Sequence, residues 1–257
     1  MGKAMSTWLL VLLGVALASA AAGEDVSATG LMRMEAEGRP KRDCWIYVPK
    51  TYDGSKLYPL VVVLHPAGLR GSLFVRSWGE VAERTGAFIV AGPECKDPRT
   101  RTWEFSDEPE FIATVKKVSK MFSIDPGRVL LTGFSQGGVY TYIFGLRNPT
   151  VFRAIAPLSG ALIARPGPES EAILLRARAE GVYIAHGALD DRIPVERARA
   201  SRDRLLQAGF SVTYREVPQL GHSFQPGEPE RIWAWFTALT SQPQPVGKKT
   251  EEPKKKE

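Results

Sequence analysis

Ser135 is the side chain in this sequence whose surroundings best fit covalent chemistry. It is the centre of the pentapeptide Gly133-Phe134-Ser135-Gln136-Gly137, which follows an apolar run and precedes a helix-like segment. A G-x-S-x-G pattern between a strand and a helix is typical of a nucleophile elbow, a strained turn that exposes the serine hydroxyl. The glycines permit close backbone approach, and the start of a helix favours a developing negative charge. The pentapeptide alone also fits an ordinary glycine-rich turn, so the interpretation depends on partners for the serine.

Such partners follow in the order acid, then histidine. A strand-like run at 182–185 ends just before Asp190 and Asp191, and another at 211–217 ends before His222. Parallel strands bring their carboxyl ends to one edge of a sheet, where sites of α/β proteins form. A serine needs an imidazole to accept its proton, and a carboxylate orients that imidazole. The acid is either of the two aspartates, and the chain has three histidines as candidate bases: His65, His186 and His222.

Strand-like and helix-like segments alternate along most of the chain. Apolar or β-branched runs predict strands at 30–37, 44–48, 60–64, 87–91, 129–131, 152–158, 182–185 and 211–217. Helical periodicity predicts helices at 72–84, 107–121, 139–146, 169–180, 195–208 and 229–239. A turn is expected at 124–128 and a long loop at 92–106. This alternation predicts an α/β protein with a mostly parallel sheet covered by helices on both faces.

Both ends of the chain differ in composition from the middle. Lys3, an apolar run at 8–17 and small residues at 18–22 predict a cleaved signal peptide over 1–22, and hence a secreted or periplasmic protein without a stable membrane anchor. An uncleaved anchor is the alternative. Residues 242–257 are rich in Lys, Glu and Pro and are expected to be a disordered tail. One catalytic domain is therefore expected over 23–241.

Charge and cysteine usage exclude several kinds of partner. The net charge of +6 falls to about +3 when Lys3 and the tail, with five Lys and three Glu, are set aside. That charge is small and dispersed, so no nucleic-acid partner is expected. The two cysteines form no C-x-x-C pattern and no Cys/His cluster. We therefore expect no metal site, and no motif indicates a cofactor.

The motifs taken together resemble the serine esterases of the α/β-hydrolase superfamily. The similarity is greatest to the phospholipase/carboxylesterase (acyl-protein-thioesterase-like) group and to the secreted polyhydroxybutyrate-depolymerase and feruloyl-esterase-like group, over residues 30–240. This resemblance implies an α/β-hydrolase fold of about eight strands, without a large lid. The residues that carry it are Tyr58-Pro59, Leu64-His65, Gly133 to Gly138, His186-Gly187, Asp190, Ile193-Pro194 and Gly221-His222.

The resemblance also implies a role for each site residue. Ser135 corresponds to the nucleophile and His222 to the base, whereas His65 and His186 are expected to be structural. Asp190 corresponds to the acid because Ile193-Pro194 follow at the family's distance, with Asp191 as the alternative. The oxyanion hole is expected to use the backbone N–H groups of Gln136 and Ala67. The family usually has His-Gly-x-Gly after this strand, but this chain has Pro66, which has no N–H to donate.

The superfamily's strand order implies a position for the cysteines. It places the second strand antiparallel to the fourth, which brings Cys44 towards Cys95. In an exported protein a disulfide between them is expected, provided that their Cα atoms lie within about 7 Å.

The expected reaction is hydrolysis of a carboxylic ester of modest size, from a small molecule or a polymer, through an acyl-enzyme. Side chains of the loop 92–106 are candidates for contacts with an acidic or aromatic part of the substrate, and a solvated loop without such contacts is the alternative. The candidates are Arg99, Arg101, Trp103 and Phe105. Two alternatives remain at this point. One is a prolyl-oligopeptidase-like peptidase, and the other is a non-catalytic binding protein on a hydrolase scaffold.

Overall fold

Buried apolar runs form the strands of one central sheet. In β3 (Tyr58–Leu64) every residue is buried, as its β-branched sequence predicts. A computed structural model of the chain describes residues 29–36, 42–163, 168–177 and 181–241. The other strands within these ranges are β1 (Gly30–Glu35), β2 (Asp43–Val48), β4 (Ile89–Pro93), β5 (Ile124–Phe134), β6 (Ala154–Leu158), β7 (Gly181–Gly187) and β8 (Ser211–Val217).

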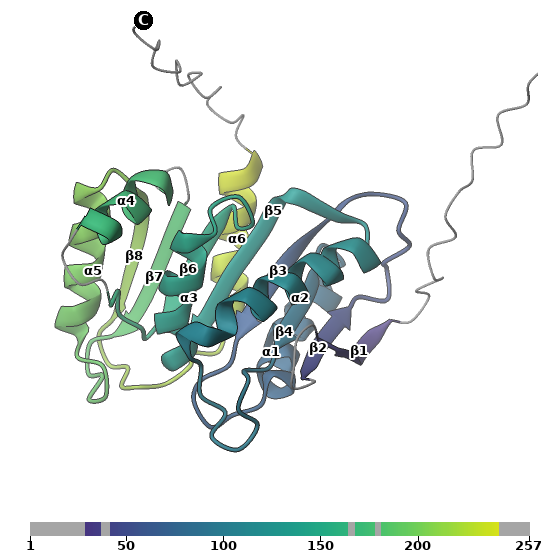
Figure 1. The fold of residues 1–257 in the computed structure, drawn as a ribbon, viewed down its shortest axis with the longest axis horizontal. Coiled ribbons are helices and arrows are strands. Elements are labelled where there is room, and N and C mark those ends of the chain that lie inside the picture. The colour runs from purple at the N-terminus through teal and green to yellow at the C-terminus, as the bar shows by residue number, and fades with distance from the viewer. Residues whose placement is uncertain (1–28, 37–41, 164–167, 178–180, 242–257) are drawn as a thin grey trace, which may run out of the picture.

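The strand order brings the carboxyl ends of six strands to one edge. The order is β1-β2-β4-β3-β5-β6-β7-β8 (Figure 1). The strand β2 pairs antiparallel with both β1 and β4, whereas all pairings from β4 to β8 are parallel. The chain leaves β3 towards β4 on one side, and β5 lies on the other side. Such a reversal of strand order is where open α/β sheets form their sites.

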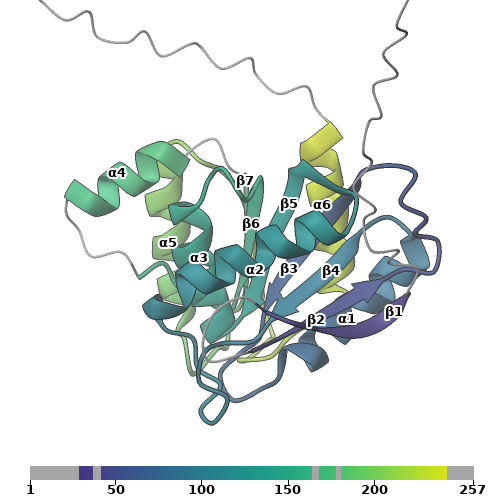
Figure 2. The same cartoon turned by 45° about the vertical axis from the view of Figure 1, so that its right-hand side comes forward.

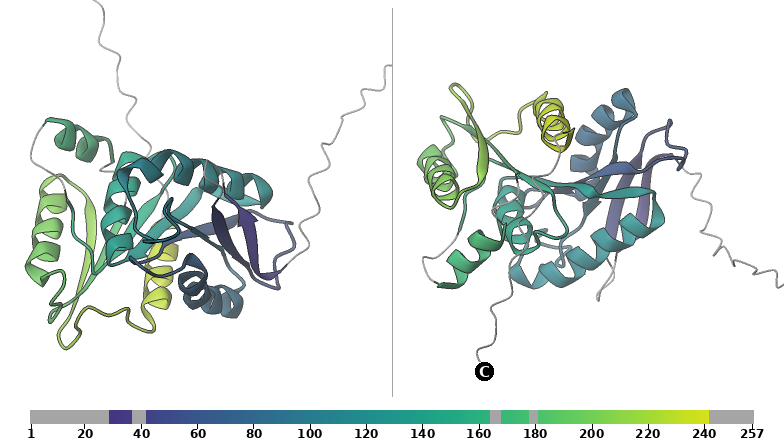
Figure 3. Two further views of the ribbon diagram at one scale, coloured as in Figure 1. Left: turned by 60° about the horizontal axis from the view of Figure 1, so that its bottom comes forward. Right: turned by 90° about the horizontal axis from the view of Figure 1, so that it is seen from above.

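Helices cover both faces of this sheet. Alternate residues of β3 face opposite sides: Val61 and Val63 pack with α1 (Gly71–Thr85) and α6 (Glu228–Ser241). The residues between them pack on the other face with α2 (Glu108–Met121), α3 (Gln136–Arg147), α4 (Pro168–Ala177) and α5 (Val195–Gln207). Figures 2 and 3 show α2 and α3 on one side of the central strands and α1 and α6 on the other. None of the helices in the described ranges is long and apolar enough to cross a membrane.

The predicted alternation of strands and helices is confirmed, with one element that differs. Residues 124–128 were expected to form a turn, but they belong to β5. Tyr58 pairs with Ile124, and Leu60 with Val129, so β5 holds three extra residues opposite β3 at this irregularity. The Pro and Gly residues within 125–128 therefore mark a bulge rather than the end of the strand. The predicted signal peptide (1–22) and tail (242–257) lie outside the described residues and remain predictions.

The expected disulfide is not formed, because both cysteines are buried free thiols. The strands β2 and β4 pair antiparallel as expected, but Cys44 lies opposite Pro93, two residues before Cys95. Diagonal neighbours in such a pair lie about 7–8 Å apart, at or beyond the separation that a disulfide bridges. The Cys44 thiol instead points to the Trp45 carbonyl at 3.8 Å, and the Cys95 thiol to that of Asp97 at 3.5 Å.

These two thiols give the first testable prediction. Titration with a chromogenic disulfide reagent should find two thiols in denaturant without reductant, and only slow reaction in the native protein. Burial raises the pKa of both thiols, that of Cys95 to about 12, so little thiolate exists at neutral pH. Cys44→Ser should halve the count in denaturant. Detection of no thiol in the denatured, unreduced protein would show that the disulfide forms after all.

Candidate active site

Ser135 lies at a sharp turn between β5 and α3. Its backbone has φ 58° and ψ −120°, a strained conformation for a residue with a side chain. The backbone on both sides is crowded. A Cβ on Gly133 would lie 2.5 Å from the carbonyl oxygen of Gly137, and a Cβ on Gly137 would overlap the carbonyl oxygen of Leu64. Glycine is therefore required at both positions, and the turn presents the serine at the N-terminus of α3.

The structure brings Ser135, His222 and Asp190 together at the carboxyl edge of the sheet. His222 follows β8, and its Nε2 lies 2.8 Å from the Ser135 Oγ. Its Nδ1 lies 2.8 Å from Oδ2 of Asp190, which follows β7. A carboxylate only accepts hydrogen bonds, so Nδ1 carries the ring proton of a neutral His222. The lone pair of Nε2 is then free to accept the serine proton.

Asp190 is held as an anion in a buried position. Its Oδ1 accepts hydrogen bonds from the backbone N–H groups of Arg192 at 3.0 Å and Ile193 at 2.8 Å. Burial alone raises the pKa of this carboxyl, but these hydrogen bonds and His222 outweigh it, so the pKa lies below its ordinary value. The alternative acid, Asp191, is exposed. Of the two aspartates, the structure therefore brings Asp190 to His222.

The other two histidines are buried, and their rings hydrogen-bond to backbone. Nε2 of His186 lies 2.7 Å from the carbonyl oxygen of Ile193 and 3.3 Å from Oδ2 of Asp190. His186 therefore packs behind the acid. Nδ1 of His65 lies 2.9 Å from the carbonyl oxygen of Pro66. Burial lowers the pKa of His65 to about 4, so this ring is neutral at neutral pH.

Backbone hydrogen bonds join the loops that carry the acid and the histidine. The N–H of Ala188 donates to the carbonyl of Val217, and the N–H of Leu189 donates to that of Leu220, both at 2.9 Å. The ring of Phe134, next to Ser135, packs on the His222 ring with their centres 5.1 Å apart. These contacts fix the two loops to each other and to the end of β5.

The expected oxyanion donors lie on either side of this turn. Gln136 is the first residue of α3, where a helix leaves N–H groups without an intrahelical acceptor. Ala67 is exposed in the loop after β3. In that loop the N–H of Gly68 already donates to the carbonyl of Arg101 at 3.0 Å, and that of Leu69 donates to Pro66 at 3.3 Å. The assignment of Gln136 and Ala67 as donors remains a prediction.

Trp103 has a different position from the one expected from the sequence. It is only 2% exposed, so it packs in the core rather than against a substrate. Its indole N–H donates to the carbonyl of His65 at 2.9 Å, and its backbone N–H donates to Oε1 of Gln136 at 2.9 Å. Trp103 therefore ties the loop after β3 to the turn at Ser135. The loop 92–106 contains two large aromatic side chains, Trp103 and Phe105, and the sequence does not show which of them is buried.

Exposed apolar side chains lie on the segments that follow several strands at the same edge. They come from the segments after β3, β4, β6 and β7, and Phe105 also packs edge-on against Tyr140. The exposed apolar side chains at this edge are Leu69, Leu73, Phe105, Ile163 and Leu189.

The described part of the chain contains no group of three or more His, Cys, Asp or Glu side chains arranged to hold a metal.

The sheet order and the Ser–His–Asp arrangement after β5, β8 and β7 define an α/β-hydrolase fold. More narrowly, the chain belongs to the phospholipase/carboxylesterase family, whose sequence pattern matches residues 106–240. The resemblance drawn from the motifs is therefore confirmed.

Individual relatives agree with this assignment. The chain is 31% identical to acyl-protein thioesterase 1 of Gibberella zeae over 114 residues, which cover 44% of this chain and 48% of the relative. It is 26% identical to carboxylesterase SOBER1 of Arabidopsis thaliana over 182 residues, which cover 67% and 72% of the two chains. The first of these matches thus spans about half the length of the relative.

Solved structures show the same fold. An acetyl xylan esterase from Aspergillus awamori has a TM-score of 0.67 at 16% identity, covering 81% of this chain and 99% of that one. A thermostable esterase has a TM-score of 0.65 at 22% identity, covering 81% and 62%.

The crowding at Gly137 predicts the effect of a single methyl group. Gly137→Ala should lower the free energy of unfolding by about 2–3 kcal/mol, because the added Cβ meets backbone carbonyls that cannot move aside easily. Urea unfolding followed by circular dichroism measures the change. Gly127→Ala is the matched control, since its Cβ meets only the Asp125 carboxylate, at 3.3 Å. Equal stability of the two variants would contradict this account of the turn.

Proposed function

We propose that this protein is a serine hydrolase that cleaves carboxylic esters through an acyl-enzyme. The observation that carries the proposal is the continuous hydrogen-bonded chain from Ser135 through His222 to Asp190. A neutral imidazole aligned on both sides is what a serine needs to become a nucleophile at neutral pH. Membership of the phospholipase/carboxylesterase family supports esters as the substrate class.

In the proposed mechanism, the Ser135 oxygen attacks the ester carbonyl carbon while Nε2 of His222 takes the serine proton. The carbonyl oxygen becomes an anion that the N–H groups of Gln136 and Ala67 stabilise. The C–O bond to the alcohol then breaks, and the imidazolium gives its proton to the leaving alkoxide. Water attacks the acyl-enzyme by the same route and releases the acid. Asp190 stabilises the imidazolium in both halves without taking its proton.

The exposed apolar side chains at this edge of the sheet favour an ester substrate whose acyl or alcohol part has substantial apolar surface. Leu69, Phe105 and Leu189 are each about half exposed or more, and burial of such surface against a substrate is favourable. A peptidase of the prolyl-oligopeptidase type would use the same three residues, so ester and anilide substrates with the same acyl group should be compared.

The decisive experiment is labelling with a fluorophosphonate probe beside an assay with a chromogenic ester. We expect labelling and turnover in the wild type and neither in Ser135→Ala, with loss of kcat of about 10⁵-fold or more.

Asp190→Asn should lower kcat by about 10³–10⁴-fold, because an amide favours the wrong tautomer of His222. Asp191→Asn, at the exposed neighbour, should retain activity. No labelling of the folded wild type would favour a binding protein on a hydrolase scaffold.

We also propose that the protein is exported. Lys3, the apolar run at 8–17 and the small residues at 18–22 support this. After expression of the full chain in a bacterial host, N-terminal sequencing of the protein outside the cytoplasm should show cleavage after Ala20 or Ala22. Leu12→Arg should block export by interrupting the apolar run. An uncleaved chain that stays in the cytoplasm would contradict the proposal.

A further inference from the structure

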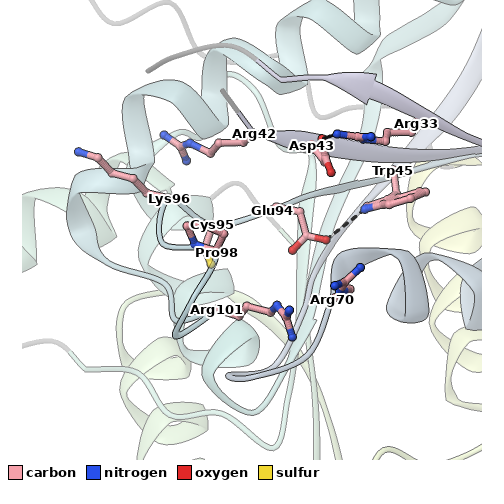
Figure 4. A pocket seen from close by; sticks show the side chains of 10 residues that line it. All are labelled: Arg33, Arg42, Asp43, Trp45, Arg70, Glu94, Cys95, Lys96, Pro98 and Arg101. Carbon is pink, nitrogen blue, oxygen red and sulfur yellow. Dashed lines mark hydrogen bonds and ion pairs between the residues drawn. The ribbon is translucent and has the colours of Figure 1, made fainter. Parts of the chain in front are cut away.

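A basic hollow of about 310 Å³ lies beside the loop that follows β3. It is formed at the ends of β2 and β4 together with the loops 65–70 and 94–101, and Figure 4 shows the side chains that line it. Cationic side chains outnumber carboxylates on its wall. The charged residues are Arg33, Arg42, Asp43, Arg70, Glu94, Lys96 and Arg101.

Some of these charges are already compensated within the protein. Arg33 pairs with Asp43 at 2.7 Å, and the buried Arg42 pairs with Asp107 at 3.0 Å. The charged side chains of the wall outside these ion pairs are one carboxylate, Glu94, and three cations, Arg70, Lys96 and Arg101. The hollow therefore retains an excess of positive charge.

The Glu94 carboxylate is occupied by the protein itself. Its Oε1 accepts hydrogen bonds from the backbone N–H of Gly71 at 2.8 Å and from the indole of Trp45 at 3.1 Å, and its Oε2 lies 3.5 Å from Nε2 of His65. Burial raises the pKa of this carboxyl. Glu94 therefore anchors the loops, and within the described residues no ion pair joins it to Arg70 or Arg101, although the charge of Arg101 opposes the effect of burial on the pKa of Glu94.

Of the three remaining cations, Arg70 and Arg101 lie beside Glu94, whereas Figure 4 shows the Lys96 ammonium pointing away from it. Within the described residues, neither guanidinium forms an ion pair with a carboxylate, and Arg101 makes only a 3.5 Å contact with the Gly68 carbonyl. Figure 4 shows them coming from different loops towards the space beside Glu94. Arg101 also has a φ of 50°, an unfavourable backbone conformation for a residue with a side chain. The surrounding backbone holds this conformation, since the N–H of Arg101 donates to the carbonyl of Asp97 at 2.9 Å and the carbonyl of Arg101 accepts from Gly68 at 3.0 Å.

The hollow is next to the proposed oxyanion hole. Arg70 belongs to the same loop as Ala67, and the N–H of Gly68 donates to the carbonyl of Arg101 at 3.0 Å. The strand β4 is separated from β5 by β3 alone. Two strand spacings amount to about 10 Å, so a substrate held at Ser135 reaches the hollow with a chain of several carbon atoms.

We propose that Arg70 and Arg101 bind an anionic group, a carboxylate or a phosphate, at the far end of the ester substrate. This inference rests on the proposed function and names the class of ester: one whose acyl or alcohol part ends in a negative charge. Planar guanidinium groups bind carboxylate and phosphate oxygens in pairs, which gives both affinity and orientation. The charge would be held beside Glu94 while the ester carbonyl lies at Ser135.

A matched pair of substrates tests this. One is the 4-nitrophenyl monoester of suberic acid, with a free terminal carboxylate, and the other has a terminal amide in its place. We expect the wild type to prefer the carboxylate about tenfold or more in kcat/KM, mainly through KM. In the variant Arg70→Gln/Arg101→Gln this preference should disappear, because kcat/KM for the carboxylate ester falls towards that for the amide. Arg76→Gln, at an exposed arginine of α1 outside the hollow, should keep the preference.

A binding measurement separates failure of this inference from failure of the proposed function. Calorimetric titration of Ser135→Ala with suberate and with inorganic phosphate should show binding that is lost when both arginines are replaced, and the stronger ligand identifies the anion. If the wild type cleaves both esters equally, or if the double variant keeps the preference, the anion site is wrong and the esterase proposal stands. If the folded wild type cleaves neither ester and no probe labels it, the esterase proposal fails. Absence of suberate and phosphate binding would then exclude the anion site as well.

Discussion

The close approach of backbone segments around Ser135 is the constraint on which the site depends. The carbonyl oxygens of Leu64 and Gly137 occupy the space where side chains of the neighbouring glycines would be. At this turn Ser135 has its strained conformation, and the loop after β3 lies directly against the start of α3. The nucleophile and the predicted oxyanion donors are thereby fixed relative to each other before any substrate binds, which is what electrostatic preorganisation requires.

Around this contact, hydrogen bonds of buried polar side chains hold the other loops at the carboxyl edge of the sheet. Trp103 joins the loop after β3 to Gln136, and Glu94 joins that loop to β2 through Trp45. On the other side, Asp190 takes two backbone N–H groups in addition to His222. Trp103 and Glu94 both bond to the loop after β3, whereas Asp190 bonds to its own loop and to His222, so polar contacts fix the segments along this edge of the sheet above an apolar core.

Local patterns were sufficient to predict the strands and the helices α1 to α6, because these depend on periodicity. The choice of His222 and Asp190 among the candidate residues came from the resemblance to the family. What the sequence did not reveal depends on register and packing. Cys44 and Cys95 lie on adjacent strands but are offset by two residues, and the Pro and Gly of 125–128 mark a bulge rather than a turn. The burial of Trp103 and the presence of Arg70 and Arg101 on the wall of one hollow depend on contacts between loops that no local pattern encodes.

The wide separation of the site residues along the chain has a consequence for folding. Asp190 and His222 are 32 residues apart, and His222 lies 87 residues after Ser135. Contacts of such long range close large loops and form only when the sheet has assembled out to β8. A chain still being synthesised, or one cut before β8, therefore has the strained serine without its base. Activity would then report completion of the native topology, and it appears only after the last parallel strand has docked.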